Sequence, residues 1–105
     1  MNNEKQRIAI AEACGWKEIA DWGAGGINGK HPTEPWVEVI PDYLNDLNAM
    51  HEAEKVFDGY GMRQSYRRNL LIACDTNDPN EIIAATAAER AEAFLRTVGK
   101  WEEEA

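Results

Sequence analysis

The side chains most suggestive of chemistry are three arginines that lie within six positions, Arg63, Arg67 and Arg68. In a helix, Arg63 and Arg67 share one flank, beside Tyr66. Guanidinium groups bind phosphate through two parallel hydrogen bonds, and an aromatic ring offers a surface on which a base can stack. The cluster therefore suggests a nucleotide-binding surface. Salt bridges to the many carboxylates of the chain are the simpler interpretation, and the one we favour.

A glycine-rich segment, DWGAGGINGKHPTEP at residues 21–35, is the second candidate site. Glycine amides and the Lys30 ammonium could hold an anion. The phosphate-loop pattern fails, however, because a required glycine is missing and His31 follows the lysine where Ser or Thr is needed. We therefore expect a long irregular loop. Trp22 and Trp36 bracket it and could line a pocket.

The cysteines and histidines do not form a metal-binding or catalytic set. Cys14 and Cys74 lack zinc-finger spacing, and His51 lacks the second histidine of a zinc-protease helix. Buried cysteines are usually inert as nucleophiles. We therefore expect no metal, no cofactor and no catalytic residue. Asn48 and His51 are the two side chains of the central helix that could contribute to a pocket.

Composition limits the function further. The chain has 105 residues with 19 acidic and 11 basic side chains, and its formal net charge is −8. This length predicts a single domain, residues 1–105. The charge argues against direct nucleic-acid binding and against binding to anionic membranes. Acidity also suits a protein that mimics DNA, although a solubilising surface is the commoner explanation.

No stretch approaches the roughly 20 apolar residues of a membrane span, and the first residues, MNNEKQR, lack the apolar core of a signal peptide. Two widely separated cysteines suggest reduced thiols rather than a disulfide scaffold. We therefore expect a cytoplasmic protein.

Hydrophobic periodicity predicts four helices. The clearest one should have Asp42 as its N-cap, while Asp46 falls inside its apolar stripe and is interpreted as a second cap or an interhelical hydrogen-bond group. A capping box, Thr86 with Glu89, marks the start of the last helix, and an earlier start at Asp78 is the weaker alternative. The four predicted ranges are 4–14, 41–57, 62–73 and 86–98.

Short strands are expected at residues 16–20, at 36–40 and at Ile82-Ile83, where β-branched and aromatic residues gather. A buried strand at 70–74 is an alternative to the end of the third helix. Gly99 should stop the last helix, Trp101 can fold back, and the EEEA tail should be solvated. The predicted fold class is α+β and mainly helical, with about four helices packed against a small, short-stranded sheet.

Three segments resemble the phage ABA sandwich domain family of small phage and prophage proteins. They are AIAEACGWK at 9–17, IPDYLNDLNAMHEAEKV at 40–56 and ATAAERAEAFLRTVGKW at 85–101, which together cover roughly 40% of the chain. The family name implies helices packed on a small sheet. Distant relatives resemble viral sponge proteins that counter the Thoeris defence and bind cyclic ADP-ribose-type signals, in some cases cyclic oligonucleotides, without cleaving them.

The resemblance implies a non-enzymatic homo-oligomer in the cytoplasm of the infected bacterium, with arginines and aromatic rings in pockets at subunit interfaces. A nucleotide-signal sponge is accordingly the first functional hypothesis. An acidic protein-interaction module or inhibitor of a host protein, perhaps mimicking DNA, is the second. A small hydrolase is the third, and it lacks a nucleophile or a metal. The expected ligand contacts come from residue chemistry and comprise nine residues: Arg63, Tyr66, Arg67, Arg68, Trp22, Trp36, Lys30, Asn48 and His51.

Overall fold

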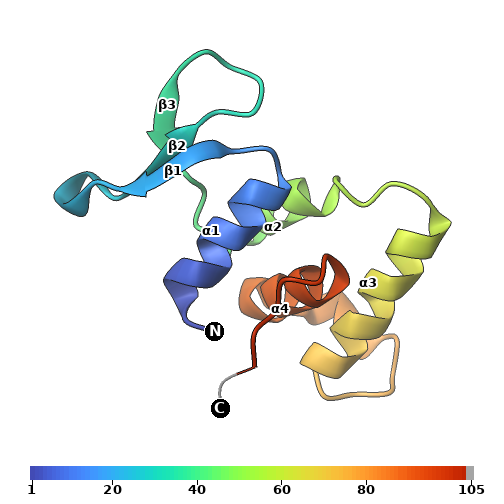
Figure 1. The fold of residues 1–105 in the computed structure, drawn as a ribbon. Helices are drawn as coiled ribbons and strands as arrows, with labels where there is room; N and C mark the ends of the chain where they lie inside the picture. Colours follow the sequence, from blue (N-terminus) through green and yellow to red (C-terminus); the bar gives the residue numbers. More distant parts are fainter. Residues whose placement is uncertain (104–105) are drawn as a thin grey trace.

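A computed structural model describes residues 1–103. In this part of the chain, four α-helices and a three-stranded antiparallel sheet confirm the predicted α+β class (Figure 1). The elements, in order, are α1 (Asn3–Ala13), β1 (Lys17–Asp21), η1 (Gly23–Gly25), β2 (Ile27–Lys30), β3 (Val37–Val39), α2 (Leu47–Glu54), α3 (Tyr60–Ala73), η2 (Glu81–Ala84) and α4 (Ala87–Thr97).

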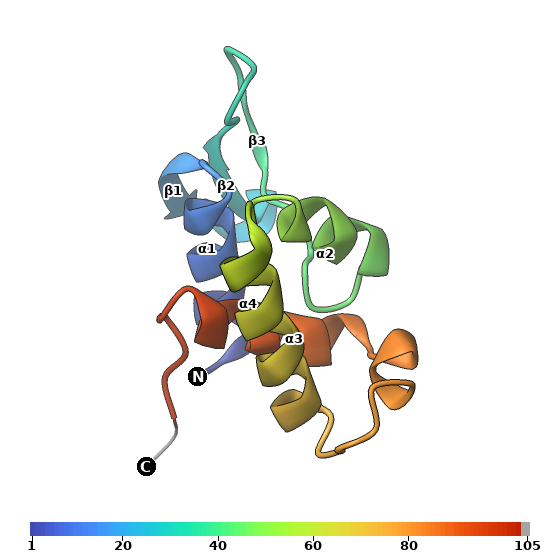
Figure 2. The same cartoon turned by 90° about the vertical axis from the view of Figure 1, so that its right-hand side faces the viewer.

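Helix α4 forms the centre of the core. Its residues Ala91, Phe94 and Leu95 have no exposed surface, and α1, α2 and α3 all pack against it. The Phe94 ring lies 4.9 Å from the ring of Phe57, which in turn lies 4.8 Å from the ring of Tyr66. The sheet lies at one end of the molecule and the loop that follows α3 lies at the other (Figures 1 and 2).

The sheet has the order β1-β2-β3, so β2 is its central strand. This corrects the expectation of an irregular loop over 21–35, because η1 and β2 both lie in that segment. The Asn28-Gly29 pair was the local signal for a turn. In the structure Asn28 is buried and donates to the carbonyl oxygens of Gly25 and Gly26, at 2.9 and 3.1 Å. A Cβ atom at Gly29 would lie 2.9 Å from Cγ1 of Ile19. Glycine is therefore needed there for close packing.

Helix α2 is shorter than predicted and begins five residues after the expected cap. Asp46 is its N-cap, with Oδ1 accepting the backbone N–H groups of Asn48 and Ala49 at 3.0 and 3.3 Å. The prediction of Asp42 as the N-cap is therefore wrong, and the alternative capping role given to Asp46 is confirmed. Asp42 instead bonds the side-chain amide of Asn45 within the turn before the helix.

Helix α4 begins where its capping box predicted. Thr86 Oγ1 accepts the Glu89 N–H at 3.1 Å, and the Glu89 carboxylate accepts the Thr86 N–H at 2.9 Å. The predicted strand at Ile82-Ile83 is wrong, because these residues lie in the 3-10 helix η2. The β-branching of the two residues had suggested a strand, but in η2 Ile82 is buried and Ile83 is 75% exposed.

The remaining predicted elements agree with the structure to within a few residues. The predicted helices at 4–14 and 62–73 correspond to α1 and α3, and the predicted strands at 16–20 and 36–40 correspond to β1 and β3. The alternative strand at 70–74 is excluded, because these residues lie in and directly after α3. Gly99 has φ of 76° after α4, and the Trp101 N–H donates to Leu95 O at 3.2 Å, so the chain folds back as expected. Of the predicted tail, residues 104–105 lie outside the described part.

No helix within residues 1–103 has the length and apolar character needed to cross a lipid bilayer. The Met1 amino group donates to the Glu102 carbonyl oxygen at 3.2 Å, which places the first residue beside the end of the described chain.

Candidate binding site on helix α3

Helix α3 separates the predicted cluster into a buried side and an exposed side. Tyr66 and Leu70 point into the core against α4. Tyr66 is only 9% exposed, so its ring is not available for stacking on a ligand. Arg67 and Arg68 lie on the opposite, exposed side of the helix. An aromatic ring is still present there, because Tyr60 at the start of α3 is 79% exposed.

The exposed arginines are not neutralised by the many carboxylates of the chain. Within residues 1–103, the side chains of Arg67 and Arg68 make no hydrogen bond and no ion pair. Arg63 makes one long contact, from Nε to the Phe57 carbonyl oxygen at 3.5 Å. The favoured interpretation of the cluster as a set of salt bridges is therefore not supported in the described chain. Charges left free in this way are available to an anionic ligand or partner.

A hollow of about 400 Å³ lies beside Arg68, where α3 ends. Its lining combines the Arg68 guanidinium, two aliphatic side chains and three polar residues of the following loop: Arg68, Leu71, Ile72, Asp75, Thr76 and Asn77. This volume is within the range of natural small-molecule sites.

The backbone of the loop is held in place by its own hydrogen bonds. The N–H groups of Asp75 and Thr76 donate to the Ile72 and Leu71 carbonyl oxygens at 3.1 Å, and Asp75 adopts a left-handed φ of 51°. Thr76 Oγ1 also accepts the N–H of Asp78 at 3.1 Å. The hollow is thus formed by ordered backbone, while the Asp75 and Asn77 side chains stay free to bind a ligand.

The hollow matches the groups of a nucleotide. Arg68 can bind a phosphate, and Leu71 with Ile72 gives an apolar wall for a base. The Asp75 carboxylate can accept hydrogen bonds from ribose hydroxyls or an exocyclic amine, and the Asn77 amide can both donate and accept. None of these lining groups is a nucleophile paired with a base.

The tryptophans and the lysine predicted as ligand contacts lie elsewhere. Trp22 and Trp36 are 61% and 50% exposed, but β2 runs between them, so they stand at opposite ends of this strand and do not border one pocket. Lys30 ends β2 beside the turn that leads to Trp36. The hollow lies at the end of α3, and the loop that follows this helix is at the opposite end of the molecule from the sheet.

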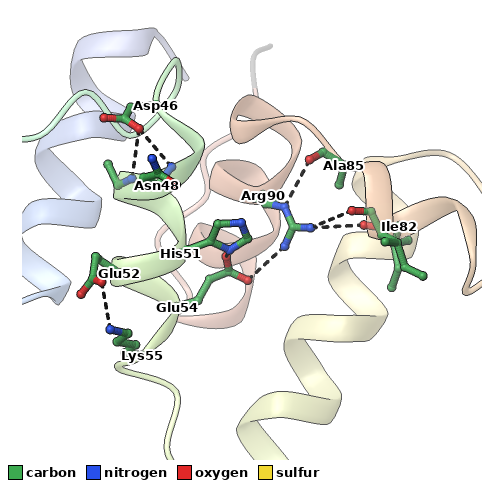
Figure 3. A network of polar contacts seen from close by, with 11 residues as sticks. Asp46, Asn48, His51, Glu52, Glu54, Lys55, Ile82, Ala85 and Arg90 are labelled. Atoms are coloured by element: carbon green, nitrogen blue, oxygen red, sulfur yellow. Dashed lines mark hydrogen bonds and ion pairs between the residues drawn. The ribbon is translucent and has the colours of Figure 1, made fainter.

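Asn48 and His51 lie on α2, within a network of polar contacts (Figure 3). Asn48 gives its backbone N–H to the Asp46 cap. His51 Nδ1 lies 3.2 Å from Oε1 of Glu54, whose other oxygen accepts from Arg90 Nη1 at 3.2 Å. Neither residue borders the α3 hollow. Their contacts are those of a helix cap and of an ion-pair network between α2 and α4.

Two exposed features were missed in the sequence, one at the start of α3 and one in the loop after it. Tyr60 precedes Arg63 and Arg67 by three and seven residues, which is helical spacing, but the predicted helix began two residues later. The residues 75–77 were interpreted only as a turn. A helix start moved back to the glycine at 59 would have placed Tyr60 on the arginine side.

In the described chain, no three His, Cys, Asp or Glu side chains come close enough together to hold a metal ion. Both cysteines are free and half-buried. Burial raises the pKa of Cys14 and of Cys74, which is opposite to the lowered pKa of an activated nucleophilic thiol. Comparison with protein-family models, with curated proteins and with solved structures found no match.

Proposed function

We propose that this protein is a phage or prophage accessory protein that binds and sequesters a nucleotide-derived immune signal of the cyclic ADP-ribose or cyclic oligonucleotide type. It acts without cleaving the signal, in the cytoplasm of the host bacterium. The observation that carries the proposal is the unneutralised arginine Arg68, which lines a hollow of about 400 Å³ and follows a second unneutralised arginine, Arg67, in a chain of net charge −8.

The charge balance gives this observation its weight. With 19 acidic side chains against 11 basic ones, an arginine would readily meet a carboxylate, and Arg90 and Arg96 each do so. Arg67 and Arg68 do not. A cyclic ADP-ribose or a cyclic oligonucleotide carries two or more phosphates, whereas the residues of the hollow can contact a ligand from one side only. We therefore include a second protomer in the proposal, which closes over the ligand in a homo-oligomer.

Calorimetry of the full chain with cyclic ADP-ribose and with cyclic di-AMP tests the proposal. We expect one of the two to bind at micromolar concentration or tighter and to be recovered intact by mass spectrometry. Arg68→Ala should weaken binding by about tenfold or more, because a hydrogen bond to a charged group contributes about 1.5–3 kcal/mol. Lys5→Ala removes an exposed cation of α1 and serves as the matched control. Absence of binding by both probes would overturn the proposal.

A second candidate, an acidic protein-interaction module that inhibits a host protein, is favoured by β3. This strand forms an edge of the sheet, and Val37 and Val39 are each 50% exposed along it. Open strand edges with apolar side chains pair readily with a strand of a partner. This second candidate would be supported if the native chain captures a host protein and the double variant Val37→Lys/Val39→Lys does not. If the native chain and the variant capture the protein equally, the edge of β3 is not the interaction site.

A further inference from the structure

A second hollow, of about 330 Å³, lies where the end of α1, the β2–β3 loop and α2 meet. It shares no lining residue with the hollow on α3. Three rings form its walls: Trp16 after α1, His31 after β2, and Tyr43 before α2. Trp16 and Tyr43 are only 7% and 3% exposed, so packing fixes their orientation, and the small part of each that stays accessible borders the hollow, which is not true of Tyr66.

His31 is locked in one orientation. Its Nδ1 accepts the backbone N–H groups of Thr33 and Glu34, both at 3.1 Å. Because Nδ1 is an acceptor, the ring proton of the neutral form resides on Nε2, which lies 3.6 Å from Oε1 of Glu38. The ring also meets the edge of Trp16 at a centroid distance of 5.2 Å. The wall is therefore formed before any ligand arrives.

Two polar groups of the hollow, the Cys14 thiol and the Tyr43 hydroxyl, are neutral. Burial raises the pKa of the Cys14 thiol and of the Tyr43 hydroxyl, and the two groups interact with each other. Both therefore stay protonated near neutral pH. Each can donate or accept a hydrogen bond at the edge of a flat ligand.

The lining contains no lysine and no arginine. The guanidinium of Arg7, whose charge acts on Tyr43, is occupied by the carbonyl oxygens of Ile40 and Pro41. The acidic member of the lining is Glu52, whose carboxylate holds Lys55 Nζ at 2.9 Å. A carboxylate or phosphate placed here would lose its hydration without gaining a partner.

From this arrangement we infer that the hollow binds a neutral, planar aromatic or heteroaromatic ring of nucleobase size. Trp16 and His31 contact the faces and edge of the ring, and the Cys14 thiol and the Tyr43 hydroxyl bond polar atoms on its rim. The occupant is a free small molecule, since the volume suits one or two fused rings. This site is independent of the phosphate-binding function proposed for α3.

Saturation-transfer NMR on the full chain, with adenine, benzamide and benzoate as probes, tests the inference. Adenine and benzamide are neutral, and benzoate matches benzamide in shape but carries a charge. We expect signals from the two neutral probes and at least about tenfold weaker binding of benzoate, because its buried charge finds no partner. Neutral probes that bind no better than benzoate would overturn the inference.

Matched variants locate the bound ring. Val56 borders the hollow and is 40% exposed, whereas Leu47 on α2 is 42% exposed and lies outside the lining. Val56→Trp should reduce binding of adenine at least about tenfold by covering the entrance, and Leu47→Trp should leave it unchanged. Equal binding by the two variants contradicts the inference. Loss of adenine binding in Arg68→Ala also contradicts it, because the probe would then occupy the α3 hollow.

Discussion

Replacing Arg90 should show most clearly how much a buried ion pair contributes to stability compared with an ion pair on the surface. Its side chain on α4 is 11% exposed, and its Nη1 lies 3.2 Å from Oε2 of Glu54 on α2, which is 19% exposed. The same guanidinium donates to the carbonyl oxygens of Ala85, Ile82 and Ile83 at 3.2–3.5 Å (Figure 3). One side chain thus joins α2, α4 and η2.

Arg90→Leu should destabilise the protein by about 3 kcal/mol. Removing one partner of a buried ion pair costs about 3–5 kcal/mol, and the partial exposure of Glu54 and its contact with His51 place the expected value at the lower end. For a domain of this size such a loss corresponds to a fall in Tm of roughly 12–24 °C. Glu54→Leu/Arg90→Leu should recover most of the loss, because no uncompensated charge then remains buried.

Urea denaturation followed by tryptophan fluorescence measures these changes, with the m-value checking that unfolding stays cooperative. Lys55→Leu is the control, because Lys55 and its partner Glu52 are 70% and 72% exposed and such pairs contribute about 0–1 kcal/mol. If Arg90→Leu costs no more than Lys55→Leu, the network is not a buried charge system. If the double variant is less stable than the single one, the reasoning on the unpaired carboxylate is refuted.

Three further predictions concern stability. Gly29→Ala should cost about 1–3 kcal/mol through its clash with Ile19, whereas Gly61→Ala on α3, with no atom within 4 Å, should be neutral or slightly stabilising by thermal unfolding. Thr86→Ala should cost about 1 kcal/mol. Hydrogen bonds from Thr86, first from its backbone N–H, lower the pKa of Glu89, so the native chain should lose more stability than Glu89→Gln as the pH falls from about 5 to 3. Burial, and then the charge of Glu54, raise the pKa of Tyr66. Unfolding should therefore release the Tyr66 proton above about pH 10, so the free energy of unfolding should fall with rising pH in that range, and less steeply in Tyr66→Phe. Equal pH slopes for the native chain and this variant would contradict the prediction.

The sequence predicted those features that depend on neighbouring residues. The capping box at Thr86 and the glycine that ends α4 are local patterns, and both occur where they were expected. Strand β2 was missed because its Asn28-Gly29 pair also has a local meaning, as a turn. What decides between the two is the packing of Gly29 on Ile19, and this contact exists only after β1 and β2 have paired.

Long-range contacts also explain why the candidate site was predicted only in part. Arg67 and Arg68 could be identified as an unusual cluster, but whether carboxylates neutralise them depends on residues brought near by the fold. The same holds for Glu54 and Arg90, which pair across 36 positions. The exposed ring of Tyr60 and the buried ring of Tyr66 lie only six positions apart in α3. Which of the two is exposed depends on which side of the helix packs against α4.

The two hollows differ in a way that bears on function. The one on α3 has a free guanidinium, that of Arg68, and a free carboxylate, whereas the one beside Trp16 has several rings and no lysine or arginine. A phosphate is stabilised in the first and excluded from the second, whereas an uncharged base gains apolar contact in the second without losing a charged partner. If both bind, we expect separate ligands, because the first hollow lies beside the loop after α3 and the second beside the β2–β3 loop, at the opposite end of the molecule. The Arg68→Ala and Val56→Trp variants should therefore affect different ligands, and a ligand sensitive to both would require a second protomer to bring one hollow of each copy together.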